Sequence, residues 1–244
     1  DLQLAFDSFY QAERVDIVVA GAFDEGQIKT LINNVSVGHQ SEVNDIIVPV
    51  NKLQPVVTDI IEMELDTVRT KVALGQRWFE NSEISTGRVA LKQAIAISLA
   101  VDLVFGEFSP TYMDWYDAAL IDDGFSAEFD WERGFAFLTI AADTPEPEEL
   151  ISNVKYELER LPERFKDLST DFELVKNDAL SRLIGKLNQL EEIVVRFEGS
   201  TFDYASLQDE IQILQTLTYV DVQQVLEEIP ISPVAAVIAR PQME

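Results

Sequence analysis

One long apolar segment constrains the fold of this chain more than any other feature of its sequence. The segment 89–105 (VALKQAIAISLAVDLVF) is interrupted by only a few polar residues, which are Lys92, Gln93, Ser98 and Asp102. A helix that is apolar on most of its faces is buried on most of them, so the segment predicts a central core helix. Arg88, Lys92 and Asp102 share the one stripe that is expected to face water, and Gly106 is expected to end the helix.

A short helix and a hairpin are predicted directly after this helix. Ser109 suits the N-cap of a helix over 110–120, with Pro110 at its first position. In GFSAEFDW (124–131) apolar and polar residues alternate with a period of two, which predicts a strand. One face of that strand should carry Phe125, Ala127, Phe129 and Trp131. A turn over 132–134 and a more fully buried strand, FAFLTIAAD (135–143), complete the predicted hairpin.

The chain before the central helix shows shorter patterns. VDIVVAG (15–21) predicts a buried strand, and Asp24 is expected to cap a helix over 25–35. Residues 36–55 show no sustained pattern and are interpreted as a linker. IIEMEL (60–65) and VRTKVALGQRWF (68–79) alternate and predict two strands joined by a turn.

The chain after the hairpin is mostly helical in pattern. Its first helix should bury a stripe formed by Leu150, Ile151, Val154, Leu158 and Leu161. A long helical run is predicted from Asp171, and two further helices from Tyr204 and Thr218, the last with Thr218 as its cap. VAAVIAR (234–240) predicts a closing strand. Together the elements predict an α+β fold with an antiparallel sheet covered by helices.

Composition and charge exclude several classes of function. The chain of 244 residues has 18 basic and 44 acidic residues, a net charge of −26, so no basic footprint for nucleic acid is expected. No uncharged apolar run reaches about 18 residues, so no membrane span is expected. The absence of cysteine excludes disulfides and thiolate zinc sites and favours a cytoplasmic location. A single histidine excludes a multi-histidine metal site.

The order of elements resembles the second half of an insulinase- or mitochondrial-processing-peptidase-like zinc metalloprotease. The resemblance rests on the pattern of elements and on one segment, LAVDLVFGEFSPTYMDWYDAALIDDGFSAEF (99–129), and VDIVVAGAFDEGQIKTLI (15–32) looks like the strand and helix that end a first domain. The part LIDDGFSAEF (120–129) is especially similar to a bacterial, Gram-positive branch encoded by paired genes. The family resemblance implies the LuxS/MPP-like fold. Residues 1–50 would be the last strand and helix of a truncated preceding domain, followed by a linker. Residues 51–244 would then form the C-terminal peptidase-like domain.

The resemblance also implies a function. The family binds zinc through an inverted His-x-x-Glu-His motif in its first domain, and this chain lacks that motif. No catalytic residue and no metal ligand is therefore expected here, and zinc is expected in the N-terminal half. The chain would wall a peptide-binding chamber and pair with that half; a homo- or heterodimer with a related subunit is a further implied assembly. The alternative is a structural or peptide-binding subunit that has lost catalysis.

Substrate-binding candidates follow from the same resemblance. The family's second domain often holds the substrate backbone with an arginine and a tyrosine; Tyr116 stands at the first position, and Asp122, Asp123 or Phe125 occupies the neighbourhood of the second. Tyr116, Asp123 and Phe125 form the predicted site with Tyr112 and Trp115, and it is expected to face the chamber rather than the core. The simpler alternative places the aromatic rings in the core or a domain contact.

The acidic pair Asp122–Asp123 and the one histidine have simple interpretations. Asp122 and Asp123 are neighbours where a strand begins, so their side chains should diverge, and a turn or cap role is favoured over a shared-proton pair. His39 falls in the linker, where a solvated loop histidine is the simplest interpretation.

Overall fold

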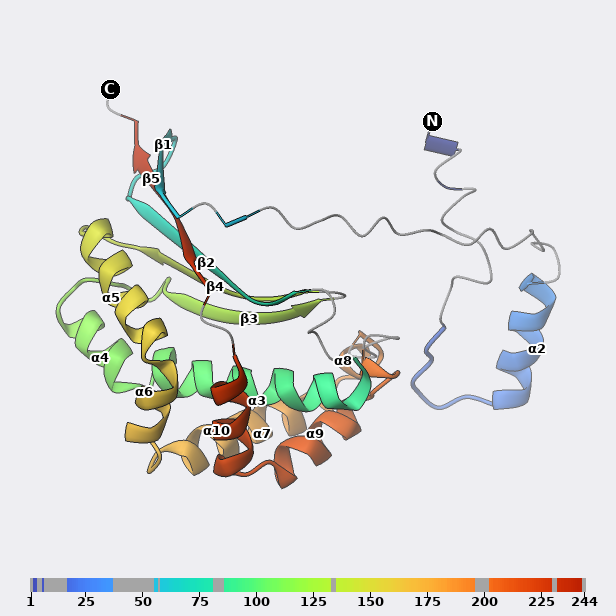
Figure 1. Ribbon diagram of the computed structural model, residues 1–244. Helices are drawn as coiled ribbons and strands as arrows, with labels where there is room; N and C mark the ends of the chain where they lie inside the picture. Colours follow the sequence, from blue (N-terminus) through green and yellow to red (C-terminus); the bar gives the residue numbers. More distant parts are fainter. Residues whose placement is uncertain are drawn as a thin grey trace.

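The polypeptide forms a five-stranded sheet with helices gathered against one of its faces (Figure 1). This architecture is that of a computed structural model, which describes residues 2, 3, 6, 17–36, 55, 56, 58–80, 86–132, 135–195, 202–229 and 232–242. The arrangement confirms the predicted α+β fold. His39 and most of the predicted linker lie outside the described residues.

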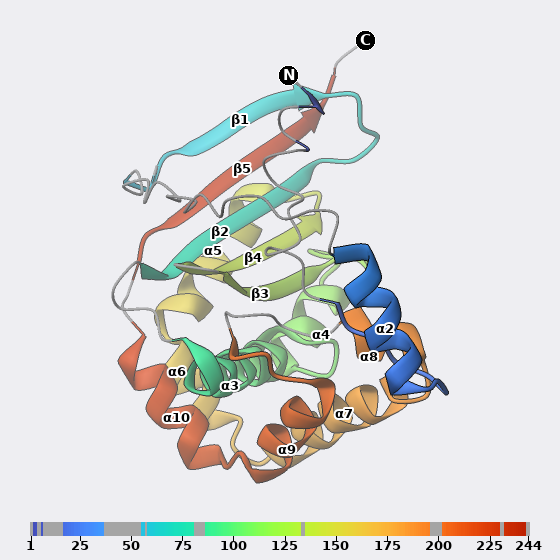
Figure 2. The same ribbon diagram turned by 90° about the vertical axis from the view of Figure 1, so that its right-hand side faces the viewer.

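The strands are arranged in the order β1-β5-β2-β4-β3, which Figure 2 shows face on. Their bounds are β1 Ile60–Leu65, β2 Lys71–Glu80, β3 Ser126–Glu132, β4 Phe135–Asp143 and β5 Val234–Pro241. All neighbouring pairs are antiparallel except β1 and β5, which are parallel. The predicted hairpin of β3 and β4 is confirmed, with Glu132 opposite Phe135.

The first two strands do not pair with each other, which corrects the simple strand-turn-strand prediction. β5 lies between them, with Ile60 opposite Ala236 and Leu74 opposite the same residue from the other side. β1 is exposed along its whole length, and Val68, predicted on one face with Val72, is 94% exposed. The alternation in IIEMEL therefore does not mark a buried face, because an edge strand that extends beyond the helices has no layer to pack on.

The helices α3–α10 occupy the covered face of the sheet. Their bounds are α3 Gly87–Phe105, α4 Pro110–Asp117, α5 Pro147–Glu159, α6 Leu161–Asp167, α7 Phe172–Lys186, α8 Leu190–Val195, α9 Leu207–Thr216 and α10 Tyr219–Glu228. The stripe predicted on the first helix after the hairpin is confirmed, with its last member at the start of α6. These helices bury one face of β2, β4 and β5 and leave the other face of the sheet open (Figure 1).

Helix α3 is the centre of the core, as predicted. Its buried residues include Ala96, Ile97, Ala100 and Val104, each less than 1% exposed. The water-facing stripe carries ion pairs from Lys92 to α10 and from Asp102 to α7. Among the described residues one stretch, Gly87–Asp117, is long and apolar enough to cross a membrane, but most of it is buried inside the protein.

Helix α2 (Glu25–Ser36) confirms the predicted helix near the start of the chain. It lies outside the body formed by the sheet and the other helices (Figure 1), and Leu31 on its apolar face is 60% exposed. The strand predicted before it is corrected: Ile17 to Ala20 have no regular secondary structure. A strand needs a hydrogen-bonded neighbour, and no described strand lies beside this segment.

Helix α10 begins with the capping box that its sequence predicts. Thr218 accepts a hydrogen bond from the Asp221 backbone N–H at 3.2 Å, and the Asp221 carboxylate accepts one from the Thr218 N–H at 2.9 Å. Lys92 of α3 donates to the same carboxylate at 2.6 Å. The Lys92 ammonium and then the Thr218 cap lower the pKa of Asp221 from 3.8 to about 2.

Replacing Asp221 with asparagine should reduce stability by about 1 kcal/mol at pH 7, because the ion pair and part of the cap are lost. The folded-state pKa lies below the unfolded value, so the carboxylate stabilises the fold above about pH 4 and loses this effect between about pH 4 and 2. Urea unfolding at pH 7 and at pH 3 measures the free energy of unfolding of variant and wild type. The difference between the two proteins should be smaller at pH 3 than at pH 7. The same difference in free energy of unfolding at both pH values would show that the ionised Asp221 carboxylate is not the source of the stabilisation.

Gly106 ends α3 at a position that no larger residue can occupy without a shift. Its N–H donates to the Asp102 carbonyl at 2.9 Å, and a Cβ at this position would lie 2.3 Å from the same oxygen. We expect Gly106→Ala to destabilise the protein by about 1–3 kcal/mol. Gly185→Ala in α7 is the matched control: its Cβ would meet nothing within 4 Å, so alanine should stabilise by about 0.5–1 kcal/mol. Opposite shifts of the urea midpoint are expected, and equal shifts would refute the steric explanation.

Candidate functional site

The aromatic residues of α4 divide between the core and the surface. Tyr112 and Trp115 are 8% and 9% exposed and belong to the main core cluster. Their rings both meet Phe125 edge-on, at centroid distances of 5.8 and 5.9 Å. This corrects the prediction that these two rings face away from the core: a helix of two turns between α3 and β3 has to fill the gap between them.

Tyr116, in contrast, is 43% exposed and stacks on Tyr112 at 5.8 Å. A hydrogen bond with the exposed Asp123 raises the pKa of the Tyr116 phenol. Phe125 is half-buried beneath the two core rings. The five predicted residues therefore lie in one cluster, with Tyr116 and Asp123 on its solvent side.

Asp122 has the turn role that was favoured from its position. Its carboxylate accepts a hydrogen bond from the Gly124 N–H at 2.9 Å, which closes the turn into β3. The same side chain forms an ion pair with Arg69, which precedes β2. It thus ties the α4–β3 loop to the segment before β2, at the same end of the sheet.

The open face of the sheet is a second candidate surface. On β4 the side chains alternate strictly between buried and half-buried, and Phe135 and Phe137 stack on the open side at 5.7 Å. Across the strands, Gly75 of β2, Thr139 of β4 and the exposed Glu128 of β3 form one row. A Cβ at Gly75 would meet nothing within 4 Å, so the space above Gly75 on this face is open.

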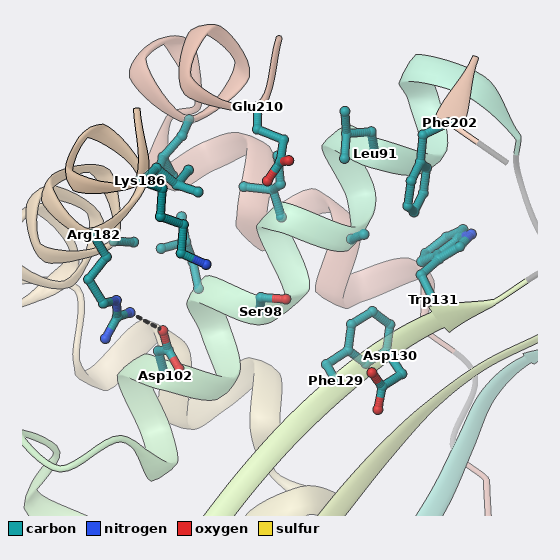
Figure 3. A pocket seen from close by; sticks show the side chains of 16 residues that line it. Leu91, Ser98, Asp102, Phe129, Asp130, Trp131, Arg182, Lys186, Phe202 and Glu210 are labelled. Atoms are coloured by element: carbon teal, nitrogen blue, oxygen red, sulfur yellow. Dashed lines mark hydrogen bonds and ion pairs between the residues drawn. The ribbon is translucent and has the colours of Figure 1, made fainter. Parts of the chain in front are cut away.

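A cavity of about 550 Å³ opens on the other side of β3, between that strand and the helices α3, α7 and α9 (Figure 3). Phe129 and Trp131 form one wall with Phe202, and Arg182 and Lys186 of α7 lie opposite. Sequence reasoning did not single out this site, because its residues come from segments far apart in the chain. The alternation of β3 placed its two aromatic residues on the correct face, which was the one available signal.

The residues of this chain do not fit a zinc ion. Within the described ranges, no three histidine, cysteine, aspartate or glutamate side chains come close enough to hold a metal. The chain's one histidine, His39, lies outside those ranges, and no cysteine exists in the sequence.

Comparison with protein families matches residues 1–177, more than half of the chain, to the family described as the Peptidase M16 inactive domain. The chain belongs to this family. The resemblance to insulinase- and processing-peptidase-like proteins is thereby confirmed at the level of the family. The M16 inactive domain here has the mixed sheet and one-sided helix layer described above.

Known relatives agree with this assignment. The chain is 29% identical over 167 residues to a Bacillus subtilis protein named "Uncharacterized zinc protease YmfH", covering 68% of this chain and 38% of that protein. The structure of a putative M16-like peptidase from Alicyclobacillus acidocaldarius superposes with a TM-score of 0.80 at 21% identity, over 99% of this chain and 57% of the other. A protease from Helicobacter pylori gives a TM-score of 0.69 at 14% identity, over 99% and 58%. The match thus covers 38% of the Bacillus protein and little more than half of each of the two solved chains.

Proposed function

We propose that this chain is the non-catalytic half of a zinc-dependent peptidase, and that it walls the peptide-binding chamber opposite a zinc-bearing domain. Membership of the M16 inactive-domain family carries this proposal, together with the relative named as a zinc protease. In this assignment residues 1–50 end a preceding domain, residues 51–244 form the C-terminal domain, and the parent protein acts in the cytoplasm.

The open face of the sheet supports a role as a wall. Helices cover one face, whereas the other carries small residues, the Phe135–Phe137 pair and two exposed acids, Glu128 and Asp130. An extended peptide could lie across such an open surface without displacing core side chains. At the end of α4, Tyr116 and Asp123 are the predicted substrate-binding residues with solvent access, whereas Tyr112, Trp115 and Phe125 would support them from below.

The 244-residue chain is expected to carry no stoichiometric zinc and to hydrolyse no peptide alone. This expectation follows from its single histidine and from the lack of three converging ligands among the described residues. Metal analysis after dialysis and a fluorogenic peptide assay would check it. One zinc ion retained per chain would contradict it.

Gly75→Trp tests the chamber wall in the parent protein that contains the zinc-bearing half. The new ring would project into open space on the sheet face, so the fold should tolerate it. We expect kcat/KM for peptide hydrolysis to fall by about tenfold, equivalent to about 1.4 kcal/mol. Gly185→Trp in α7, also facing open space, should leave hydrolysis unchanged. Equal kcat/KM values for Gly75→Trp and Gly185→Trp would refute the proposal that this sheet face lines the peptide-binding chamber.

The same experiment separates the alternative function. A parent protein that binds peptide but holds no zinc and hydrolyses nothing would be a peptide-binding or structural subunit. In that case Gly75→Trp would weaken peptide binding instead of turnover.

A further inference from the structure

We propose that the cavity between α3, β3, α7 and α9 binds a short peptide of two or three residues, with free termini and an apolar side chain. The inference deepens the proposed function, because short peptides are what a peptidase releases. It rests on three features of the cavity: its size, its aromatic wall, and two of its charged side chains, Lys186 and Glu210. A volume of about 550 Å³ is in the usual range for small-molecule sites, about 300–1,000 Å³.

The apolar wall would hold the peptide side chain. Phe129 and Trp131 of β3 meet edge-on at 6.2 Å, and Phe202 lies next to Trp131 on the same side of the cavity (Figure 3). Leu91 and Leu99 of α3 continue this surface and are themselves almost fully buried. Such a surface favours a leucine or phenylalanine side chain over a polar one.

Lys186 is the cation available for the peptide carboxylate. The other cation, Arg182, is already shared between Asp102 at 3.0 Å and Asp178 at 2.9 Å, so it closes that end of the cavity. The Lys186 ammonium lies 3.5 Å from Glu192, longer than the usual 2.7–2.9 Å of a charge-assisted hydrogen bond. Its side chain enters the cavity from α7 (Figure 3), so its donors can reach a bound anion.

Glu210 supplies the opposite charge for the peptide ammonium. It enters the cavity from the first turn of α9 and is only 4% exposed (Figure 3). Glu210 is engaged within the chain, but an ionised carboxylate can accept about four hydrogen bonds and so has room for a ligand. A positive and a negative group beside one apolar wall match the ends and side chain of a zwitterionic peptide, whereas a fatty acid brings no ammonium group to Glu210.

The segment before α9, which places Phe202 in the cavity wall, has an unfavourable backbone conformation at two residues. Asp203 and Tyr204 have φ of +57° and +54°, a region that disfavours residues other than glycine by about 1–2 kcal/mol each. They hold Phe202 and Ala205 in a small cluster with Leu91. Backbone strain of this kind gathers at ligand-binding segments, where surrounding contacts maintain it.

Calorimetric titration of the 244-residue chain with leucyl-phenylalanine tests the proposal without any hydrolysis, so its outcome is separate from that of the proposed function. We expect binding of the free dipeptide, and binding at least about tenfold weaker for its N-acetyl and C-amide forms. Lys186→Met should weaken free-dipeptide binding by about tenfold, whereas Lys166→Met on the exposed face of α6 should not change it. Glu210→Gln should reduce the preference for a free amino terminus.

Thermal melts of each variant check that it is folded. Lys186→Met is the principal variant, because the Lys186 side chain is 36% exposed and its replacement should disturb the fold less than a change at the buried Glu210. Equal affinity for free and capped dipeptides would overturn the proposal. So would tighter binding of octanoate than of the dipeptide, or no binding of the dipeptide at millimolar concentration.

Discussion

Replacing Leu99 with aspartate is expected to abolish cooperative folding of the chain. Leu99 is 3% exposed on α3, the helix on which the core is built, and aspartate would place an unpaired charge there. Such a substitution costs several kcal/mol, a large part of the about 5–15 kcal/mol that stabilises a typical domain. Circular dichroism melts would show the loss as a missing or strongly lowered transition.

Val89→Asp is the matched control on the same helix. Val89 is 64% exposed in the first turn, where an acidic side chain interacts favourably with the helix dipole. Its melting temperature should stay close to that of the wild type. A Leu99→Asp variant that melts within a degree or two of the wild type would show that α3 is not the core.

Replacing Phe165 with alanine is expected to cost about 3–5 kcal/mol. Phe165 is fully buried where α6, α7 and α10 meet. Its ring stacks on Tyr219 at 4.8 Å and meets Phe172 edge-on at 6.0 Å, so truncation leaves a cavity bordered by two rings. Urea unfolding would measure the loss.

Phe108→Ala provides the comparison for a surface ring. Phe108 is 76% exposed, so its truncation should change stability by no more than about 0.5 kcal/mol. The stability loss of Phe165→Leu should lie between those of Phe165→Ala and Phe108→Ala, because leucine removes less side-chain volume than alanine does. Similar losses for Phe165→Ala and Phe108→Ala would contradict the aromatic cluster as a structural centre.

Local patterns were sufficient to predict most elements of the fold. The apolar run of α3, the period-two alternation of β3 and the Thr218 cap of α10 each depend on residues close together in the sequence. Elements that depend on neighbouring residues can therefore be predicted from the sequence alone. The pairing of β1 was not predictable in this way, because its neighbour β5 comes from the far end of the chain and neither pattern specifies the other.

The candidate site was predictable only in part. The α4 segment was located correctly, but no local signal distinguishes the buried Tyr112 from the exposed Tyr116, one helical turn away. Burial there depends on where β3 and α3 pass. The cavity was missed because Lys186 and Phe202 gain significance only when α7 and the segment before α9 meet β3.

The position of β5 also determines the order in which the fold can be completed. β1 is formed by Ile60–Leu65, but its one neighbour in the described sheet is Val234–Pro241. During synthesis the ribosome must therefore make β2, the hairpin and every helix before β1 can join the sheet. Until then the apolar residues Ile61, Met63 and Leu65 sit on an unpaired strand, which favours association with other nascent chains. The helical layer can assemble earlier, so folding should proceed from the centre of the sheet toward this edge.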